Sequence, residues 1–214
     1  MGSRVSGPAT DLDPTRAGGE AHHARPGEPD ILPGEKVHDF PGEGIVVQFR
    51  PTRCIHAADC VRGLPQVFRP GERPWIHAER SEPDQVAEVV IRCPTGALSY
   101  SRQDGGPDEV PAARNTAVIS RDGPIYLRGR IRLVTPEGEL VLQDTRVALC
   151  RCGQSQNKPF CDNSHREAGF ADPGHVAPNE VELEGTAGEL VIKLRQNGSL
   201  KVDGPFTLVG ADGV

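Results

Sequence analysis

The sequence is poor in large apolar side chains. It contains 6 Phe, 2 Tyr and 1 Trp among 214 residues, together with a single Met. Aromatic side chains normally bury the largest areas in a core, and small units that lack them are often stabilised by metals. This scarcity favours small metal-stapled units over one large apolar core.

The sequence has no long apolar run, and no stretch approaches the roughly 20 apolar residues that span a bilayer. The N-terminus lacks a charged segment followed by an apolar one, so no secretory signal is visible. Acidic residues outnumber basic ones by 30 to 24, which argues against nucleic acid as the main partner. We therefore expect a cytoplasmic protein with neither a membrane nor a nucleic acid as its partner.

Familiar catalytic motifs are missing as well. The sequence contains no G-x-G-x-x-G, no P-loop and no G-x-S-x-G. Its Asp and Glu pairs are scattered through loops and form no recognisable acid–base dyad. The sequence therefore does not indicate a stand-alone catalyst, and an enzyme component whose active site pairs with another subunit stays open.

Six cysteines carry most of the functional information, and they fall into two triplets. Without an export signal the compartment is expected to be reducing, where clustered cysteines bind metals or act in catalysis rather than form disulfides. Two triplets indicate two sites. The first comprises Cys54, Cys60 and Cys93, and the second Cys150, Cys152 and Cys161.

The chain divides by composition into four parts. Residues 1–40 are rich in Gly, Pro and charge and read as a disordered tail, in which His22 and His23 are solvated. Residues 41–101 form a first domain, with a β-type run over 44–49 and a helix that begins at Ser81 as N-cap and ends before Cys93-Pro94. Residues 102–116 read as an interdomain linker.

Residues 117–214 form a second, β-rich domain with an internal repeat. Residues 122–134 match residues 197–209 without gaps at an offset of 75, and both copies begin with a hairpin-type dipeptide. Alternation in the first copy predicts half-buried strands. Its polar face, rich in arginine, is either a solvated face or a dock for an acidic redox partner. The apolar face contains Ile125, Leu127, Ile131 and Leu133, and the polar face Tyr126, Arg128, Arg130 and Arg132.

The second triplet is completed by a histidine. Cys150, Cys152, Cys161 and His165 lie within 16 residues, and Gly153 suits a loop that folds back. Thiolates and imidazole are the ligands of zinc and of iron–sulfur iron. The residue types alone leave a Cys3His zinc site and an iron–sulfur cluster equally open.

This segment resembles the CDGSH iron–sulfur family, whose pattern is C-x-C-x2-(S/T)-x3-P-x-C-D-G-(S/A/T)-H. Only Asn163 departs from it, where the family usually has Gly, and Asn also tolerates a left-handed backbone. The resemblance implies a 2Fe–2S cluster, with Cys150 and Cys152 on one iron and Cys161 and His165 on the other. It also implies that the remaining motif positions bind the cofactor, namely Ser155, Pro159, Asp162 and Ser164.

A mixed ligand set has chemical consequences. A neutral imidazole in place of a thiolate raises the cluster's potential relative to an all-cysteine site. Because a ligating histidine must be unprotonated, acid competes with iron for it. We expect a cluster that becomes labile at mildly acidic pH and whose reduction is coupled to protonation. Asp162 either caps the short helix that starts at the motif or bonds near the cluster.

The first triplet resembles the divergent mono-cluster ferredoxin family, on Cys54-x-His56, Trp75 and the Cys-Pro-Thr-Gly-Ala-Leu stretch from Cys93. The bacterial pattern C-x2-C-x2-C has a ligand where this chain has Ala57. The simplest consequence is a 3Fe–4S cluster on three thiolates. The alternative is 4Fe–4S with a neighbouring ligand, His56 or Asp59.

Together these features predict an α+β protein with an N-terminal ferredoxin-like domain and a C-terminal β-rich CDGSH domain. Two clusters without a substrate motif indicate electron transfer to a redox partner protein. The alternatives are cluster transfer, redox or pH sensing, and a zinc-stabilised interaction module. The chain is expected to be a monomer or a homodimer, since the duplicated β-unit can replace a second protomer.

Overall fold

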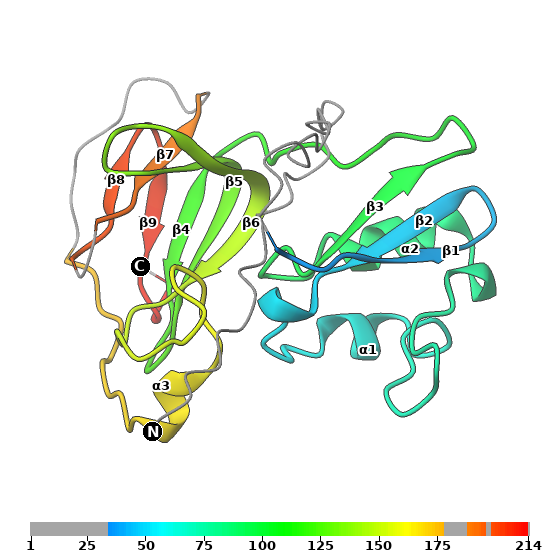
Figure 1. Cartoon of the computed structure of the whole chain (residues 1–214), viewed down its shortest axis with the longest axis horizontal. Coiled ribbons are helices and arrows are strands. Elements are labelled where there is room, and N and C mark those ends of the chain that lie inside the picture. Colours follow the sequence, from blue (N-terminus) through cyan, green and yellow to red (C-terminus); the bar gives the residue numbers. More distant parts are fainter. Residues whose placement is uncertain (1–33, 178–187, 196–197, 214) are drawn as a thin grey trace, which may run out of the picture.

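The computed structural model describes residues 34–177, 188–195 and 198–213. The chain forms two lobes that lie side by side, one carrying β1 to β3 and the other β4 to β9 (Figure 1). Both helices and strands are present, and the second lobe is strand-rich, in agreement with the α+β class. Most of the predicted tail, including His22 and His23, lies outside the described residues.

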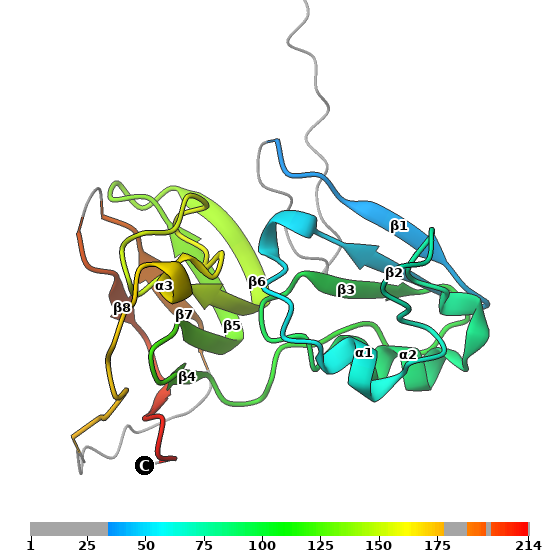
Figure 2. The same ribbon diagram turned by 90° about the horizontal axis from the view of Figure 1, so that it is seen from below.

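The N-terminal lobe is a three-stranded antiparallel sheet of order β1-β2-β3, with α1 and α2 on one of its faces (Figure 2). Apolar side chains of β2 and α2 meet in its core, among them Ile45, Val47, Val86 and Val90. The elements are β1 (His38–Pro41), β2 (Ile45–Phe49), η1 (Pro51–Arg53), α1 (Asp59–Gly63), η2 (Ala78–Arg80), α2 (Pro83–Val90) and β3 (Leu98–Arg102). Strand β1 thus begins within the segment that composition assigns to the tail, because it pairs with β2.

Helix α2 confirms the expected valine face but begins one residue later than the sequence suggests. Its N-cap is Glu82, and Pro83 occupies the first turn, where a missing N–H costs nothing. The Ser81 hydroxyl instead donates a hydrogen bond of 2.7 Å to Gln85. The helix ends at Val90, ahead of Cys93, as the following proline requires.

The C-terminal lobe is a sheet of order β8-β7-β5-β4-β9, with β6 paired to β5. Strand β5 pairs with β4 through its first half and with β7 through its second, and a register irregularity at Gly129 separates the halves. The elements are β4 (Thr116–Ile119), β5 (Ile125–Val134), β6 (Leu140–Leu149), α3 (Ser164–Glu167), β7 (Leu190–Lys193), β8 (Lys201–Asp203) and β9 (Thr207–Val209).

The two copies of the repeat diverge at one glycine position. Gly129 and Gly204 occupy equivalent places and both have positive φ, 136° and 115°. The first copy continues as β5, whereas Pro205 after Gly204 splits the second copy into β8 and β9. Asn115 joins the copies, since its amide accepts from the Arg130 N–H at 2.8 Å and donates to the Pro205 carbonyl at 2.8 Å. Asn197, the first residue of the second copy, lies outside the described residues.

A buried ion-pair network connects the lobes through β6. The Arg146 guanidinium donates to the carbonyls of Val90 and Cys93, each at 2.8 Å, and pairs with Glu109 at 2.7 Å. Arg53 pairs with Asp144 at 2.6 Å. Burial raises the pKa of the Asp144 carboxyl, which the neighbouring Arg53 and Arg146 oppose.

The segment that composition assigns to a linker takes part in this network. Glu109 lies in the middle of this segment and is only 7% exposed, because its carboxylate pairs with the buried Arg146 guanidinium between the lobes. The arginine face of β5 is mostly exposed at Arg128 and Arg130, while Arg132 pairs with Glu189 at 3.0 Å. No helix in the described part of the chain has the length and apolar character needed to cross a membrane.

Replacing Arg146 by Met should destabilise the protein strongly, because it leaves Glu109 buried without its cation and removes the guanidinium donors from three carbonyls. Breaking a buried ion pair in this way costs about 3–5 kcal/mol of unfolding free energy. Denaturant titration of the parent and the variant measures the difference.

Arg132→Met is the matched control, since it removes an ion pair of β5 that is partly exposed at both ends. Such a pair contributes only about 0–1 kcal/mol. Equal losses in the two variants would contradict a network that joins the lobes.

Candidate metal centres

The second triplet lies where β6 ends and the chain folds back on itself. The Cys150 N–H donates to the Pro159 carbonyl, and the Cys161 N–H donates to the Ala148 carbonyl, both at 2.9 Å. These bonds bring Cys161 beside the end of β6. The loop is held from inside by Ser155, whose buried hydroxyl donates to the Phe160 carbonyl at 2.7 Å.

The four predicted ligands form two pairs. The sulfur atoms of Cys150 and Cys152 lie 3.7 Å apart, and Cys161 Sγ lies 3.5 Å from His165 Nδ1. No three Cys, His, Asp or Glu side chains among the described residues are grouped to hold one metal ion. A zinc site needs its donors around a single point, whereas a cluster with two irons takes two donors at each. Donor type and pairing therefore both fit a two-iron cluster.

The environment favours the metal-binding protonation state of His165 but not that of Cys161. Burial raises the pKa of the Cys161 thiol, and the N–H of Asn163, 3.5 Å from the sulfur, acts in the opposite direction. Burial, with a contribution from Arg166, lowers the pKa of His165. The His165 imidazole therefore stays neutral to lower pH than a free histidine, as a ligand must.

Asp162 serves the loop backbone. Its carboxylate accepts from the Ser164 N–H at 3.0 Å and from the Gln156 N–H at 2.8 Å. Desolvation acts to raise its pKa, but these hydrogen bonds outweigh it and lower the pKa to about 2. Asn163 is the N-cap of α3. Its φ of 74° is left-handed, which suits a position where the motif usually has Gly. Contact of Ser155, Pro159, Asp162 or Ser164 with a cofactor stays a prediction.

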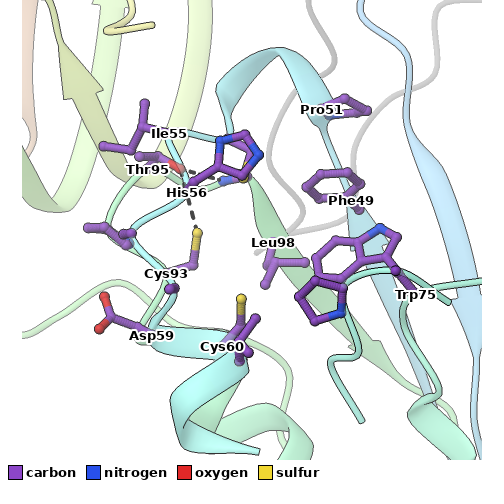
Figure 3. Close-up of a pocket in the computed structure, with 18 of the residues that line it drawn as sticks. Phe49, Pro51, Ile55, His56, Asp59, Cys60, Trp75, Cys93, Thr95 and Leu98 are labelled. Atoms are coloured by element: carbon purple, nitrogen blue, oxygen red, sulfur yellow. Dashed lines mark hydrogen bonds between the residues drawn. The ribbon is translucent and has the colours of Figure 1, made fainter. Parts of the chain in front are cut away.

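The first triplet lines a cavity of about 810 Å³. Cys54 follows η1, Cys60 lies in α1, and Cys93 follows α2, so three separate elements bring the thiols together. Figure 3 shows the sulfur atoms of Cys60 and Cys93 directed into the same space, with the Trp75 ring across from them. The rings of Trp75 and Phe49 pack edge to face with their centroids 4.9 Å apart. Both side chains form an apolar wall of the cavity.

Two of these thiols, those of Cys54 and Cys60, have raised pKa values. Burial raises the pKa of Cys60 to about 11, with Cys93 adding to the effect. Burial also raises the pKa of Cys54, which a hydrogen bond from the His56 N–H partly offsets. Binding of a soft metal would therefore release protons, as thiolate ligation does elsewhere.

The two candidate fourth ligands beside Ala57 are placed differently. The Asp59 carboxylate accepts a hydrogen bond of 2.8 Å from Arg62, and Figure 3 shows it turned away from the cysteine sulfurs. His56 lines the cavity with an exposed side chain and a left-handed φ of 56°. Of the two, His56 is the side chain for which the described residues show no competing ion pair.

Comparison with known proteins matches both halves. Residues 40–103 match the family model "Divergent 4Fe-4S mono-cluster", and residues 122–166 match "Iron-binding zinc finger CDGSH type". The chain therefore contains a CDGSH-type iron-binding domain over residues 122–166. It carries a divergent mono-cluster domain ahead of the CDGSH motif, so both resemblances seen in the sequence are confirmed.

The N-terminal half also has curated relatives. The chain is 38% identical over 61 residues to "Uncharacterized protein YjdI" of Escherichia coli strain K12 and of Escherichia coli O157:H7. The match covers 28% of this chain and 80% of each relative. No solved structure matches the chain.

The sequence alone did not predict the residues that form contacts between the two lobes and between the loops of the two candidate centres. Asp144 and Arg146 share the strand face of buried Leu142, and charged residues in a buried phase of alternation are the signal that marks them. Asn163 stands out only as a departure from the motif. Its side chain donates a hydrogen bond of 2.8 Å to the Ile55 carbonyl, in the loop of the first triplet.

Acid should release iron from the CDGSH centre through His165. Because the pKa of His165 is lowered, protons begin to compete only below the usual histidine range, and the visible absorption of the centre should fall as the pH drops through mildly acidic values. His165→Cys replaces the imidazole by a thiolate and should shift this loss to lower pH. Identical acid profiles for the parent and the variant would refute a ligand role for His165.

Proposed function

We propose that this protein is an electron carrier with a 2Fe–2S cluster on Cys150, Cys152, Cys161 and His165, and a second cluster on Cys54, Cys60 and Cys93. The observation that carries the proposal is the arrangement of donors, two close pairs in one lobe and three thiols around one cavity in the other. Both family matches describe iron-binding units. The described residues hold each donor set on a separate lobe of one joined body.

An electron carrier needs its clusters insulated from water and able to change charge. Phe49, Trp75 and Leu98 supply apolar walls to the first cavity, and Cys161 and His165 are both buried. The clusters, when bound, supply one-electron redox chemistry. The chain's part is to hold the thiolates, to keep His165 neutral and to limit the access of water, and a redox partner protein then supplies or accepts the electron.

For the first centre we propose 3Fe–4S. Ala57 offers no donor and Asp59 is engaged by Arg62, which leaves three thiolates. The alternative is 4Fe–4S completed by His56, which agrees with the wording of the matched family model. The ferredoxin-like description of the N-terminal lobe belongs to the same proposal, and its three-stranded sheet with two helices supports an α+β unit.

Quantification of iron, zinc and acid-labile sulfide, with EPR of the protein as isolated, tests the proposal. An oxidised 3Fe–4S centre gives a signal as isolated, whereas an oxidised 2Fe–2S centre is silent until reduced. Colourless protein that contains zinc and no sulfide would refute electron transfer and favour the zinc-stabilised interaction module.

His56→Ala separates the two forms of the first centre. If the cluster is 3Fe–4S, the variant should keep the iron content and EPR signal of the parent. If His56 holds a fourth iron, the parent is EPR-silent as oxidised 4Fe–4S and the variant loses iron and gains the 3Fe signal. Asp59→Ala is the control, since its carboxylate faces Arg62, and it should leave both quantities unchanged.

Cluster transfer or pH sensing is the second candidate function. The observation that favours it is the position of the His165 imidazole beside Cys161, among the predicted ligands. A single imidazole ligand in a centre otherwise held by thiolates is a point at which acid can open the site. Transfer of iron and sulfide to an acceptor apoprotein, faster at pH 6 than at pH 8, would support this role over electron transfer.

A further inference from the structure

The loops that carry the ligands of the two centres touch each other. The side-chain amide of Asn163 donates a hydrogen bond of 2.8 Å to the carbonyl of Ile55. Ile55 directly follows Cys54, and Asn163 lies between Cys161 and His165. One hydrogen bond therefore links the peptide beside a first-centre ligand to a residue between two second-centre ligands.

The orientation of the Asn163 amide is fixed by its partner. A carbonyl only accepts, so the NH2 end must face Ile55, and a flipped amide would oppose two oxygens. The other end, Oδ1, is buried and has no hydrogen-bond partner among the described residues. The chain therefore bears the cost of an unsatisfied oxygen at the position where this contact is made.

Apolar packing reinforces the hydrogen bond. Ile55 and Cys161 are 5% and 4% exposed and form one buried cluster with Ala148, against which Ala57 and Tyr126 pack. Ile55, Ala57 and His165 also line one cavity of about 560 Å³. The Ile55 side chain thus rests on a second-centre ligand while its carbonyl accepts from Asn163.

Asn163 also contacts a ligand directly. Its backbone N–H lies 3.5 Å from Cys161 Sγ and donates to that sulfur. The same residue therefore supports a ligand of the second centre through its backbone and holds the loop of the first centre through its side chain. Asn163 therefore contacts both ligand loops, in addition to the packing of Ile55 on Cys161.

We propose that Asn163 is a positioning residue that couples retention of the two clusters. A cluster bound at one centre orders its ligand loop, and the contact between Asn163 and Ile55 passes that order to the other loop. Coupling of this kind is reciprocal, so each cluster protects the other. The inference rests on the proposed function in needing both clusters, and it adds that their binding is cooperative.

The test is a double-mutant cycle on cluster release. Cys60→Ala removes a ligand of the first centre without changing the Ile55 peptide, and release of the 2Fe–2S cluster to excess chelator at neutral pH is followed by the EPR of reduced samples. In the parent background Cys60→Ala should speed release about two- to tenfold, the range that one hydrogen bond of ordinary net strength supports. In the Asn163→Gly background the same change should have no effect on the rate.

Asn163→Gly is suited to the cycle because glycine adopts the left-handed φ of 74° and is the usual residue of the family motif. Asn163→Asp is the isosteric partner, since a carboxylate has no donor for Ile55, and it should abolish coupling equally. Asn157→Ala is the matched control. It removes another hydrogen bond between the lobes, to the Thr52 carbonyl at 2.6 Å, and should leave the coupling intact.

A second readout needs no cluster. In the metal-free chain, Asn163→Gly should raise hydrogen exchange at the amides of residues 54–60, whereas Asn157→Ala should leave them near the parent rate. Equal acceleration of release by Cys60→Ala in the parent, Gly and Asp backgrounds would overturn the coupling. Cys93→Ala, which removes the first centre by another route, must give the same pattern.

The failure of this inference differs from failure of the proposed function. If iron and sulfide are missing from one or both centres of the purified protein, the proposed function is refuted, and the double-mutant cycle is not needed. Protein that holds both clusters but shows additive release rates keeps the proposed function and rejects the role of Asn163.

Discussion

The buried ion pair between Arg146 and Glu109 is the interaction on which the rest of the structure depends. Arg146 extends from β6 into the neighbouring lobe, where its guanidinium donates to the carbonyls of Val90 and Cys93 and pairs with Glu109. Val90 is the last residue of α2, and Cys93 is a predicted ligand of the first centre. Four residues further along the same chain segment comes Cys150, the first predicted ligand of the second centre. A single strand therefore sets the positions of both donor sets.

The sequence predicted the parts of the molecule that follow from local rules. The valine face of α2, the β-type run of β2 and the alternation in β5 are all present, because each depends on periodicity within one segment. The pairing of Cys150 with Cys152 and of Cys161 with His165 agrees with the motif, since a short loop held by its own backbone hydrogen bonds brings them together.

What the sequence did not predict depends on contacts between distant segments. Glu109 lies in a stretch whose composition indicates a linker, and only the position of Arg146 explains why it is buried. The side chain of Asn163 reaches a carbonyl 108 positions earlier in the chain, which no local pattern encodes. Ser81 has a residue type that is common at N-caps, but α2 begins at Pro83, whose fixed φ favours the first turn of a helix.

The splitting of the second repeat at Gly204 and Pro205 has a consequence for solubility at high concentration. Strands β8 and β9 are three residues each and stand at the two ends of the strand order β8-β7-β5-β4-β9. Brief outer strands offer few unpaired backbone groups to another molecule, and proteins commonly use them to avoid edge-to-edge aggregation. The split second copy therefore limits intermolecular pairing at these two ends of the strand order.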